Sequence, residues 1–141
     1  MAAAPSVTSF KLDRSGLARL FGDLEAGIME ALWELGEGTV GSVSTYLDAH
    51  QQYTTLQTVL NRLVDKGILE RSGRLGGAVL YRPAEPRNVF LERTSRQVVE
   101  SLIADFGQAA MRGLVDAVGE IDSGQLEALE ELVQARRRYV P

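Results

Sequence analysis

The sequence predicts a mainly α-helical protein with a small β-hairpin, because apolar residues recur at helical spacing along most of the chain. The exception is residues 68–82, where two short β-type runs flank a cluster of glycines, as in a two-stranded hairpin. Pro83 and Pro86 then interrupt the chain, and a second series of helical patterns begins. We therefore predict a helical domain with a hairpin at residues 22–84 and a helical region at residues 85–141, after a flexible extension at residues 1–21.

The N-terminal extension contains few large apolar side chains. We expect residues 1–10 to be disordered, and residues 15–21 to form a short turn that packs on the domain or on a partner chain. The extension lacks the basic start and apolar core of a secretory signal. No run in the chain approaches the roughly 18 apolar residues of a membrane span. These features predict a cytoplasmic protein with no membrane partner.

Two helices are predicted to open the domain. The first begins near Gly22-Asp23, with Asp23 as its cap, and ends at Gly36. The second is capped by Thr39 and runs from Val40 to about Ala49. Their expected buried positions are Leu24, Ile28, Met29, Leu32, Trp33 and Leu35, followed by Val40, Val43, Tyr46 and Leu47.

The third helix is the clearest single element, because five apolar residues give it one continuous stripe at i, i+3, i+4, i+7 and i+8 spacing. These residues are Leu56, Val59, Leu60, Leu63 and Val64. We expect Thr54 or Thr55 to cap its start and Lys66-Gly67 to end it. In the following hairpin, Gly73 to Gly77 are expected to form a loop of several residues.

This order of helix, helix, turn, helix and hairpin is that of a winged helix-turn-helix domain. Opposite its apolar stripe the third helix carries small or hydrogen-bonding side chains, namely Thr55, Gln57, Thr58, Asn61 and Arg62. Such side chains suit base edges in the DNA major groove and the neighbouring phosphates. For this segment alone, the alternative is an ordinary amphipathic helix with a solvated face beside a plain hairpin.

The charge distribution favours a focused binding patch for DNA. The chain has a net charge of −4, whereas residues 62–82 contain five cations and two anions, a local net charge of +3. Arg62, Arg71 and Arg74 are the cations expected on one edge of the domain. Acidic surface elsewhere would weaken sequence-independent binding and leave recognition to this patch. A solvated charged face is the alternative explanation.

The composition argues against an enzyme or a metal site. The chain has no cysteine, which removes disulfides, thiol nucleophiles and thiolate ligands together. The single histidine, His50, lies in a polar loop and cannot form a multi-histidine site. We find no catalytic set of nucleophile, base and acid, and the glycines at residues 73–77 lie in a hairpin, not in a phosphate-binding turn. We expect no cofactor, no metal and no catalytic residue.

The region after the prolines predicts further helices with one-sided apolar faces. Gly107, Gly113 and Gly119 punctuate residues 87–119, so we expect two helices there, the second from about Gln108 to Val118. Asp122 or Ser123 is expected to cap a last helix from Leu126 to about Tyr139. The arginines at residues 136–138 suit the negative end of its dipole, and contact with nucleic acid is the alternative.

These C-terminal helices carry too little apolar bulk for an independent core, so we expect them to bury their stripes against a second copy of the chain. The candidate dimerisation residues are Val98, Leu102, Phe106, Leu114, Leu126, Leu129, Leu132 and Val133. A dimer would place two DNA-reading helices about one helical turn apart, as a palindromic operator requires. The alternative is that the helices fold back on their own N-terminal domain.

The residues also carry a family resemblance. Gly22-Asp23-Leu24-Glu25, then Ile28-Met29 and Leu32-Trp33, resemble the opening motif of the BlaI/MecI/CopY family of transcriptional repressors. Tyr53-Thr54-Thr55-Leu56, with the residues to Gly67, resembles the family's recognition helix, and Leu80-Tyr81-Arg82-Pro83 its closing wing strand. The resemblance is clear over residues 22–83 and continues weakly to the end.

The resemblance implies a homodimeric winged-helix repressor bound to palindromic double-stranded DNA operators. It implies that Thr55, Gln57, Thr58 and Arg62 face the DNA, with the Arg74 loop near phosphate. The candidate DNA-binding residues are Tyr53, Thr54, Thr55, Gln57, Thr58, Asn61, Arg62, Arg71 and Arg74.

Some family members are released from DNA when a sensor protease cuts an Asn–Phe bond in the C-terminal helices, whereas this chain has Asp105-Phe106 there. Copper-responsive members use a cysteine-rich motif, which this chain lacks. A winged helix that binds another protein and not DNA is the alternative function.

Overall fold

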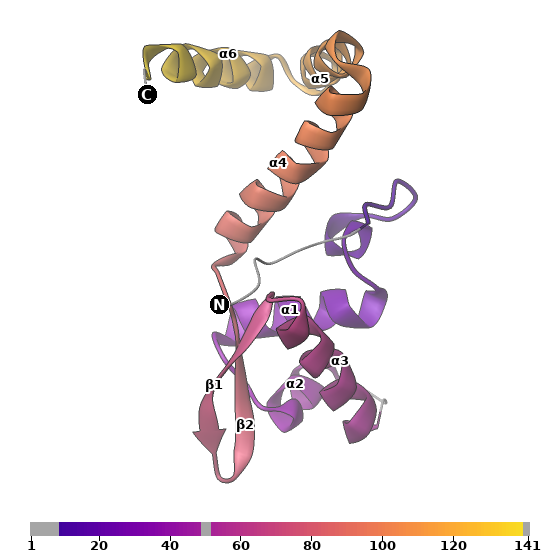
Figure 1. Cartoon of the computed structure of the whole chain (residues 1–141), viewed down its shortest axis with the longest axis vertical. Helices are drawn as coiled ribbons and strands as arrows, with labels where there is room; N and C mark the ends of the chain where they lie inside the picture. Colours follow the sequence, from indigo (N-terminus) through magenta and orange to yellow (C-terminus); the bar gives the residue numbers. More distant parts are fainter. Residues whose placement is uncertain (1–8, 49–51, 140–141) are drawn as a thin grey trace. The chain divides into compact units, whose positions relative to one another are not determined.

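The structure is a computed structural model that describes residues 9–48 and 52–139. The chain divides into two compact units, one ending at Thr94 and the other beginning at Ser95. Figure 1 labels their helices and strands along the chain. Of residues 1–10, which are expected to be disordered, residues 1–8 lie outside the described residues, whereas Phe10 is described and its ring contacts the Arg19 guanidinium at 5.6 Å. The expected end of the second helix at Ala49 also lies outside the described residues.

The first unit opens with a short 3-10 helix, η1 (Gly16–Arg19), and three α-helices, α1 (Asp23–Leu35), α2 (Val40–Leu47) and α3 (Tyr53–Asp65). Thr39 caps α2 as predicted, because its hydroxyl accepts a hydrogen bond from the Ser42 N–H at 3.2 Å while the Ser42 hydroxyl accepts from the Thr39 N–H at 2.7 Å. Gly36 ends α1 with φ 86°, also as predicted.

Two of the predicted helix caps are wrong. Gly22 occupies the N-cap of α1, and Asp23 lies in the first turn, where its carboxylate still faces the positive end of the helix dipole. The helix α3 begins before either threonine, because the Gln52 carbonyl already accepts hydrogen bonds from the N–H groups of Thr55 and Leu56. Thr54 and Thr55 are therefore inside the first turn of α3.

The hairpin consists of the antiparallel strands β1 (Leu69–Leu75) and β2 (Ala78–Pro83). The predicted loop of several residues is wrong, because only Gly76 and Gly77 separate the strands. Their φ angles of 56° and 85° are the positive values that a tight type I′ turn requires at both positions. The other residues of the predicted loop, 73–75, pair with residues 78–80 of β2, and the register shift between Arg71 and Gly73 leaves Ser72 as the extra residue of β1. Tyr81 of β2 also pairs with Gly38, in the turn that precedes α2.

The core of the first unit lies between the three helices and the hairpin. The predicted stripe of α3 is confirmed, since Leu56, Leu60 and Leu63 have no exposed area. The predictions for Leu35 and Tyr46 are wrong, because these side chains are 44% and 48% exposed. Both lie at the last turn of a short helix, where the chain turns away before the side chain is covered.

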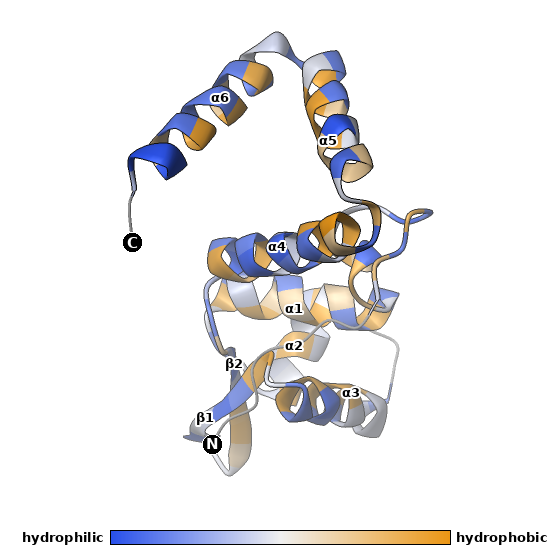
Figure 2. Ribbon diagram, turned by 45° about the horizontal axis from the view of Figure 1, so that its top comes forward, coloured by the Kyte–Doolittle hydropathy of each residue, from blue (hydrophilic) through white to orange (hydrophobic). Residues whose placement is uncertain are grey.

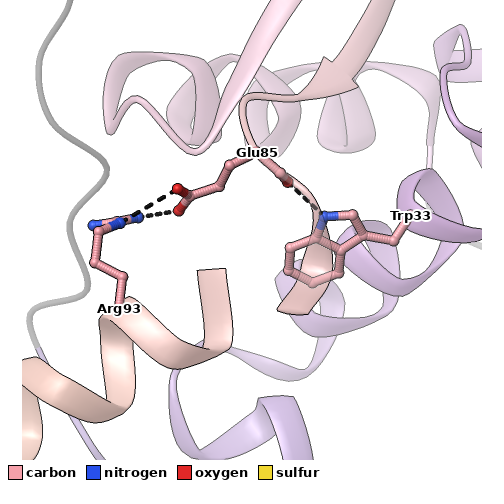
Figure 3. Close-up of polar contacts among 3 residues, drawn as sticks. All are labelled: Trp33, Glu85 and Arg93. Atoms are coloured by element: carbon pink, nitrogen blue, oxygen red, sulfur yellow. Dashed lines mark hydrogen bonds and ion pairs between the residues drawn. The ribbon is translucent and has the colours of Figure 1, made fainter. Parts of the chain in front are cut away.

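Residues 15–21 form the expected short turn and pack on the domain through Leu17 and Phe21, which are buried. The next helix, α4 (Arg87–Phe106), begins in the first unit. Its buried Phe90 stacks on Phe21, with ring centroids 5.7 Å apart, and also contacts the Trp33 ring at 5.3 Å. The Trp33 indole N–H donates to the Glu85 carbonyl at 3.1 Å, and the Glu85 carboxylate pairs with Arg93 (Figure 3). These contacts anchor the start of α4 to α1.

The second unit contains the end of α4, α5 (Gln108–Ile121) and α6 (Ser123–Arg138). Gly107, with φ 54°, separates α4 from α5 as predicted, whereas Gly113 and Gly119 lie within α5 and do not interrupt it. The Asp122 carboxylate accepts from the Gly124 N–H at 2.8 Å and caps α6, which begins before the expected Leu126. Apolar residues recur along α5 and α6 between polar ones (Figure 2). From Ser95 to Tyr139, no described residue is buried.

Candidate nucleic-acid interface

The outer face of α3 carries the polar residues predicted to contact DNA. Tyr53 is 56% exposed, and the side chains near it on the same helix are exposed or half-buried. The exposed ones are Thr54, Thr55, Thr58 and Arg62, and the half-buried ones are Gln57 and Asn61. Because the other face of α3 packs into the core, this is the face of α3 that a ligand can reach.

The first turns of α3 present hydroxyl and amide groups more than charge. The Thr58 hydroxyl donates to the Thr54 carbonyl at 2.8 Å, which fixes the hydroxyl against its own helix and leaves an oxygen lone pair for an outside donor. Arg62, one turn further along, is exposed and has no hydrogen-bond or ion-pair partner among the described residues. Its guanidinium is therefore free to bind an anion or a base edge.

The hairpin brings Arg71 against α3. The Arg71 Nη2 donates to the Asn61 Oδ1 at 3.0 Å, so these two predicted contact residues meet across the space between helix and strand. Arg74 lies at the tip of the hairpin and donates to the Gly77 carbonyl at 2.8 Å, which folds its side chain over the turn. Arg71 and Arg74 are both exposed.

Two of the cations in residues 62–82 form ion pairs with carboxylates, and the other three do not. Lys66 pairs with Glu25 at 3.3 Å, and Arg82 pairs with Glu70 at 2.6 Å. Arg62, Arg71 and Arg74 face no carboxylate among the described residues. The positive charge that is not neutralised is therefore carried by the end of α3 and by the hairpin.

Tyr81 lies beneath this surface and supports it, and it is not among the predicted DNA contacts. It is only 2% exposed, and its hydroxyl donates to the Asn61 Oδ1 at 3.0 Å. A tyrosine at a buried strand position needs a partner for its hydroxyl, and that requirement was a signal available in the sequence. Which helix residue would accept the hydrogen bond depends on the fold.

The candidate dimerisation residues are apolar side chains of the second unit that are exposed to solvent or half-buried. Phe106 is 63% exposed and Leu132 68%; the other candidates are 39–45% exposed, except Val98 and Leu129, which are half-buried. An open apolar groove of about 400 Å³ lies between the end of α4 and α5, lined in part by Leu102, Phe106, Met111 and Leu114. Val98, Leu126, Leu129 and Val133 complete the predicted set.

Within residues 9–48 and 52–139, no group of histidine, aspartate and glutamate side chains is arranged to hold a metal ion. His50, predicted to be a solvated loop residue, lies outside that part of the chain. No helix of the described residues is long and apolar enough to cross a bilayer.

Comparison with known proteins places the whole arrangement in one family. The chain matches the family model described as penicillinase repressor over residues 21–135, which includes both the winged domain and the C-terminal helices. No curated protein matches the chain. Since the match covers most of the sequence, the chain belongs to the penicillinase repressor (BlaI/MecI) family, whose members are DNA-binding transcriptional repressors and not enzymes.

Proposed function

We propose that this repressor acts in the cytoplasm as a homodimer that occupies palindromic operators and so blocks transcription. The observation that carries the proposal is the outer face of α3, where hydrogen-bonding side chains lie beside three arginines that no carboxylate of the described residues neutralises. A helix with such a face, next to a basic hairpin, is the form in which winged helix-turn-helix domains dock on DNA.

In this proposal α3 enters the major groove. Thr55, Gln57 and Thr58 contact base edges, because amide and hydroxyl groups match their donors and acceptors. Arg62 contacts a guanine edge or a phosphate, and Arg71 and Arg74 bind phosphates beside the groove. Tyr53 and Thr54, at the start of α3, lie where the helix would meet the DNA backbone.

The C-terminal helices supply the second half of the proposal. The candidate dimerisation residues carry apolar area that water covers in the isolated chain, and burial in an interface is worth about 25 cal/mol per Å² of it. A symmetric pair would present two copies of α3 to two half-sites, which matches a palindrome. Release from the operator then requires an inducer, either a sensor protease that acts on these helices or a ligand.

Selection of DNA fragments from a genomic library by the purified protein, sequenced at two salt concentrations, tests the proposal. We expect an enriched palindrome with half-sites about one helical turn apart, and an affinity that falls steeply with salt because counterions are released. Enrichment of a single, non-repeated site would contradict the dimeric arrangement. No enrichment, with no binding even at low salt, would favour the alternative in which α3 binds another protein.

A further inference from the structure

We propose that Asn61 is a positioning residue, which holds Arg71 of the hairpin at a fixed place beside α3, and that it does not itself read a base. The inference rests on the proposed function, because Arg71 is assigned there to a DNA phosphate. Asn61 and Arg71, which the sequence pattern groups together as DNA contacts, then have separate roles.

The geometry begins with the oxygen of the Asn61 side chain. Asn61 Oδ1 accepts a hydrogen bond from Arg71 Nη2 and another from the Tyr81 hydroxyl, each at 3.0 Å. A guanidinium can only donate, so the atom that faces Arg71 must be the carbonyl oxygen and not the amide nitrogen. Both acceptor positions of that oxygen are then used within the protein, so Asn61 cannot make the paired contact with adenine N6 and N7 by which asparagine usually reads a base, and only its amide N–H groups are left to donate.

The two donors come from a fixed pair of strand positions. Arg71 of β1 and Tyr81 of β2 are direct cross-strand partners, and side chains of such a pair lie on the same face of a sheet. Tyr81 is held by its burial and by backbone hydrogen bonds of 2.8 and 2.9 Å with Gly38. Asn61 is thus the one described α3 residue with side-chain hydrogen bonds to both strands.

The choice of an amide also preserves the charge of Arg71. Arg82, on the neighbouring strand, is held by the Glu70 carboxylate at 2.6 Å, and that ion pair neutralises it. Arg71 is held by a neutral oxygen through one of its N–H groups, so its positive charge and its other donors remain available. An arginine that is placed but not neutralised is suited to a phosphate.

The test compares Asn61→Ala, Arg71→Ala and the double variant on the operator found by the library selection. Affinity is measured over a range of salt concentrations, together with the base preference at each operator position. We expect each single variant to lower the slope of log affinity against log salt by about 1, the loss of one phosphate contact. We expect the double variant to match Arg71→Ala, and the base preference to stay unchanged.

A base-reading Asn61 would behave differently, and that result would overturn the inference. Asn61→Ala would then relax the preference at one base pair, keep the salt slope, and add its effect to that of Arg71→Ala. Tyr81→Phe serves as a second variant if Asn61→Ala does not fold, and it should loosen Arg71 in the same direction by a smaller amount. Failure of the unaltered protein to bind any operator would instead overturn the proposed function, and this inference with it.

Discussion

The two units of this repressor are built from helices of similar amphipathic pattern, yet they differ in what their apolar faces contact. In the first unit the apolar faces of α1, α2 and α3 meet one another and the hairpin, so that side chains such as Leu32 and Leu60 have no exposed area. In the second unit no described residue is buried. An amphipathic sequence therefore predicts that a face will be covered, and not what covers it.

The difference has an energetic consequence. A covered leucine gains about 1.5–3 kcal/mol relative to an exposed one, and the first unit contains many such residues within one chain. The second unit can gain the same energy only from surface that lies outside itself. We therefore expect substitutions in the first unit to change folding, and substitutions in the second to change association.

The largest effect is expected from Phe90→Ala in the first unit. Phe90 is 1% exposed and packs against Phe21 and Trp33, so its removal leaves a cavity beside these two aromatic rings. We expect a loss of about 3–5 kcal/mol in the free energy of unfolding, measured by denaturant titration. The matched control is Phe106→Ala, at the other end of α4, where the ring is 63% exposed.

The control makes the comparison between the units falsifiable. In dilute monomer, Phe106→Ala should change the unfolding of the first unit by less than about 0.5 kcal/mol, the usual range for exposed positions. Equal destabilisation by the two alanine variants would mean that the two units do not differ in the way their exposures indicate.

An intermediate effect is expected from Leu132→Asp or Leu129→Asp in the second unit. Either change places a carboxylate in the apolar stripe of α6, and the charge must lose its water if the stripe is buried in a dimer. We expect the dimer to weaken by roughly 2–4 kcal/mol, from lost apolar burial and from desolvation. Sedimentation velocity should then show monomer at concentrations where the unaltered protein is a dimer.

Gln134→Asp is the matched control for this change, because residue 134 lies on α6 outside the apolar stripe. It introduces the same charge and should leave the dimer intact. If Leu132→Asp also leaves the sedimentation profile unchanged, the alternative in which the C-terminal helices fold back on their own domain is favoured.

The features of the fold that were predicted correctly depend on interactions between residues that are close in the sequence. The stripe of α3, the cap at Thr39, the break at Gly107 and the cap at Asp122 each depend on residues within a few positions of one another. The wrong caps at Asp23 and at Thr54 or Thr55 displaced a helix start by only a few residues, whereas the error in the hairpin arose where distant parts decide the outcome. The loop of the hairpin is shorter than predicted because Gly73, Arg74 and Leu75 pair with β2, and nothing in the glycine pattern fixes that register.

The candidate site shows the same division. Periodicity alone placed the polar residues on one face of α3, and the structure confirms that they lie opposite the core. Periodicity could not reveal that Asn61 accepts hydrogen bonds from Arg71 and Tyr81, because these residues meet only when the hairpin packs beside α3. The roles of these residues toward DNA stay predictions.

The smallest effect is expected from Arg62→Ala, which should separate DNA contact from both folding and association. Arg62 is exposed and unpaired among the described residues, so its loss should leave unfolding and dimerisation unchanged. We expect operator binding to weaken by roughly 1–3 kcal/mol, the worth of one specific base or phosphate contact. Arg87→Ala is the control, because it removes the same charge from a side chain that pairs with Glu30 at 3.0 Å. A loss of affinity of equal size in both variants would mean that operator binding responds only to net charge, and the assignment of α3 as the reading helix would then lose its support.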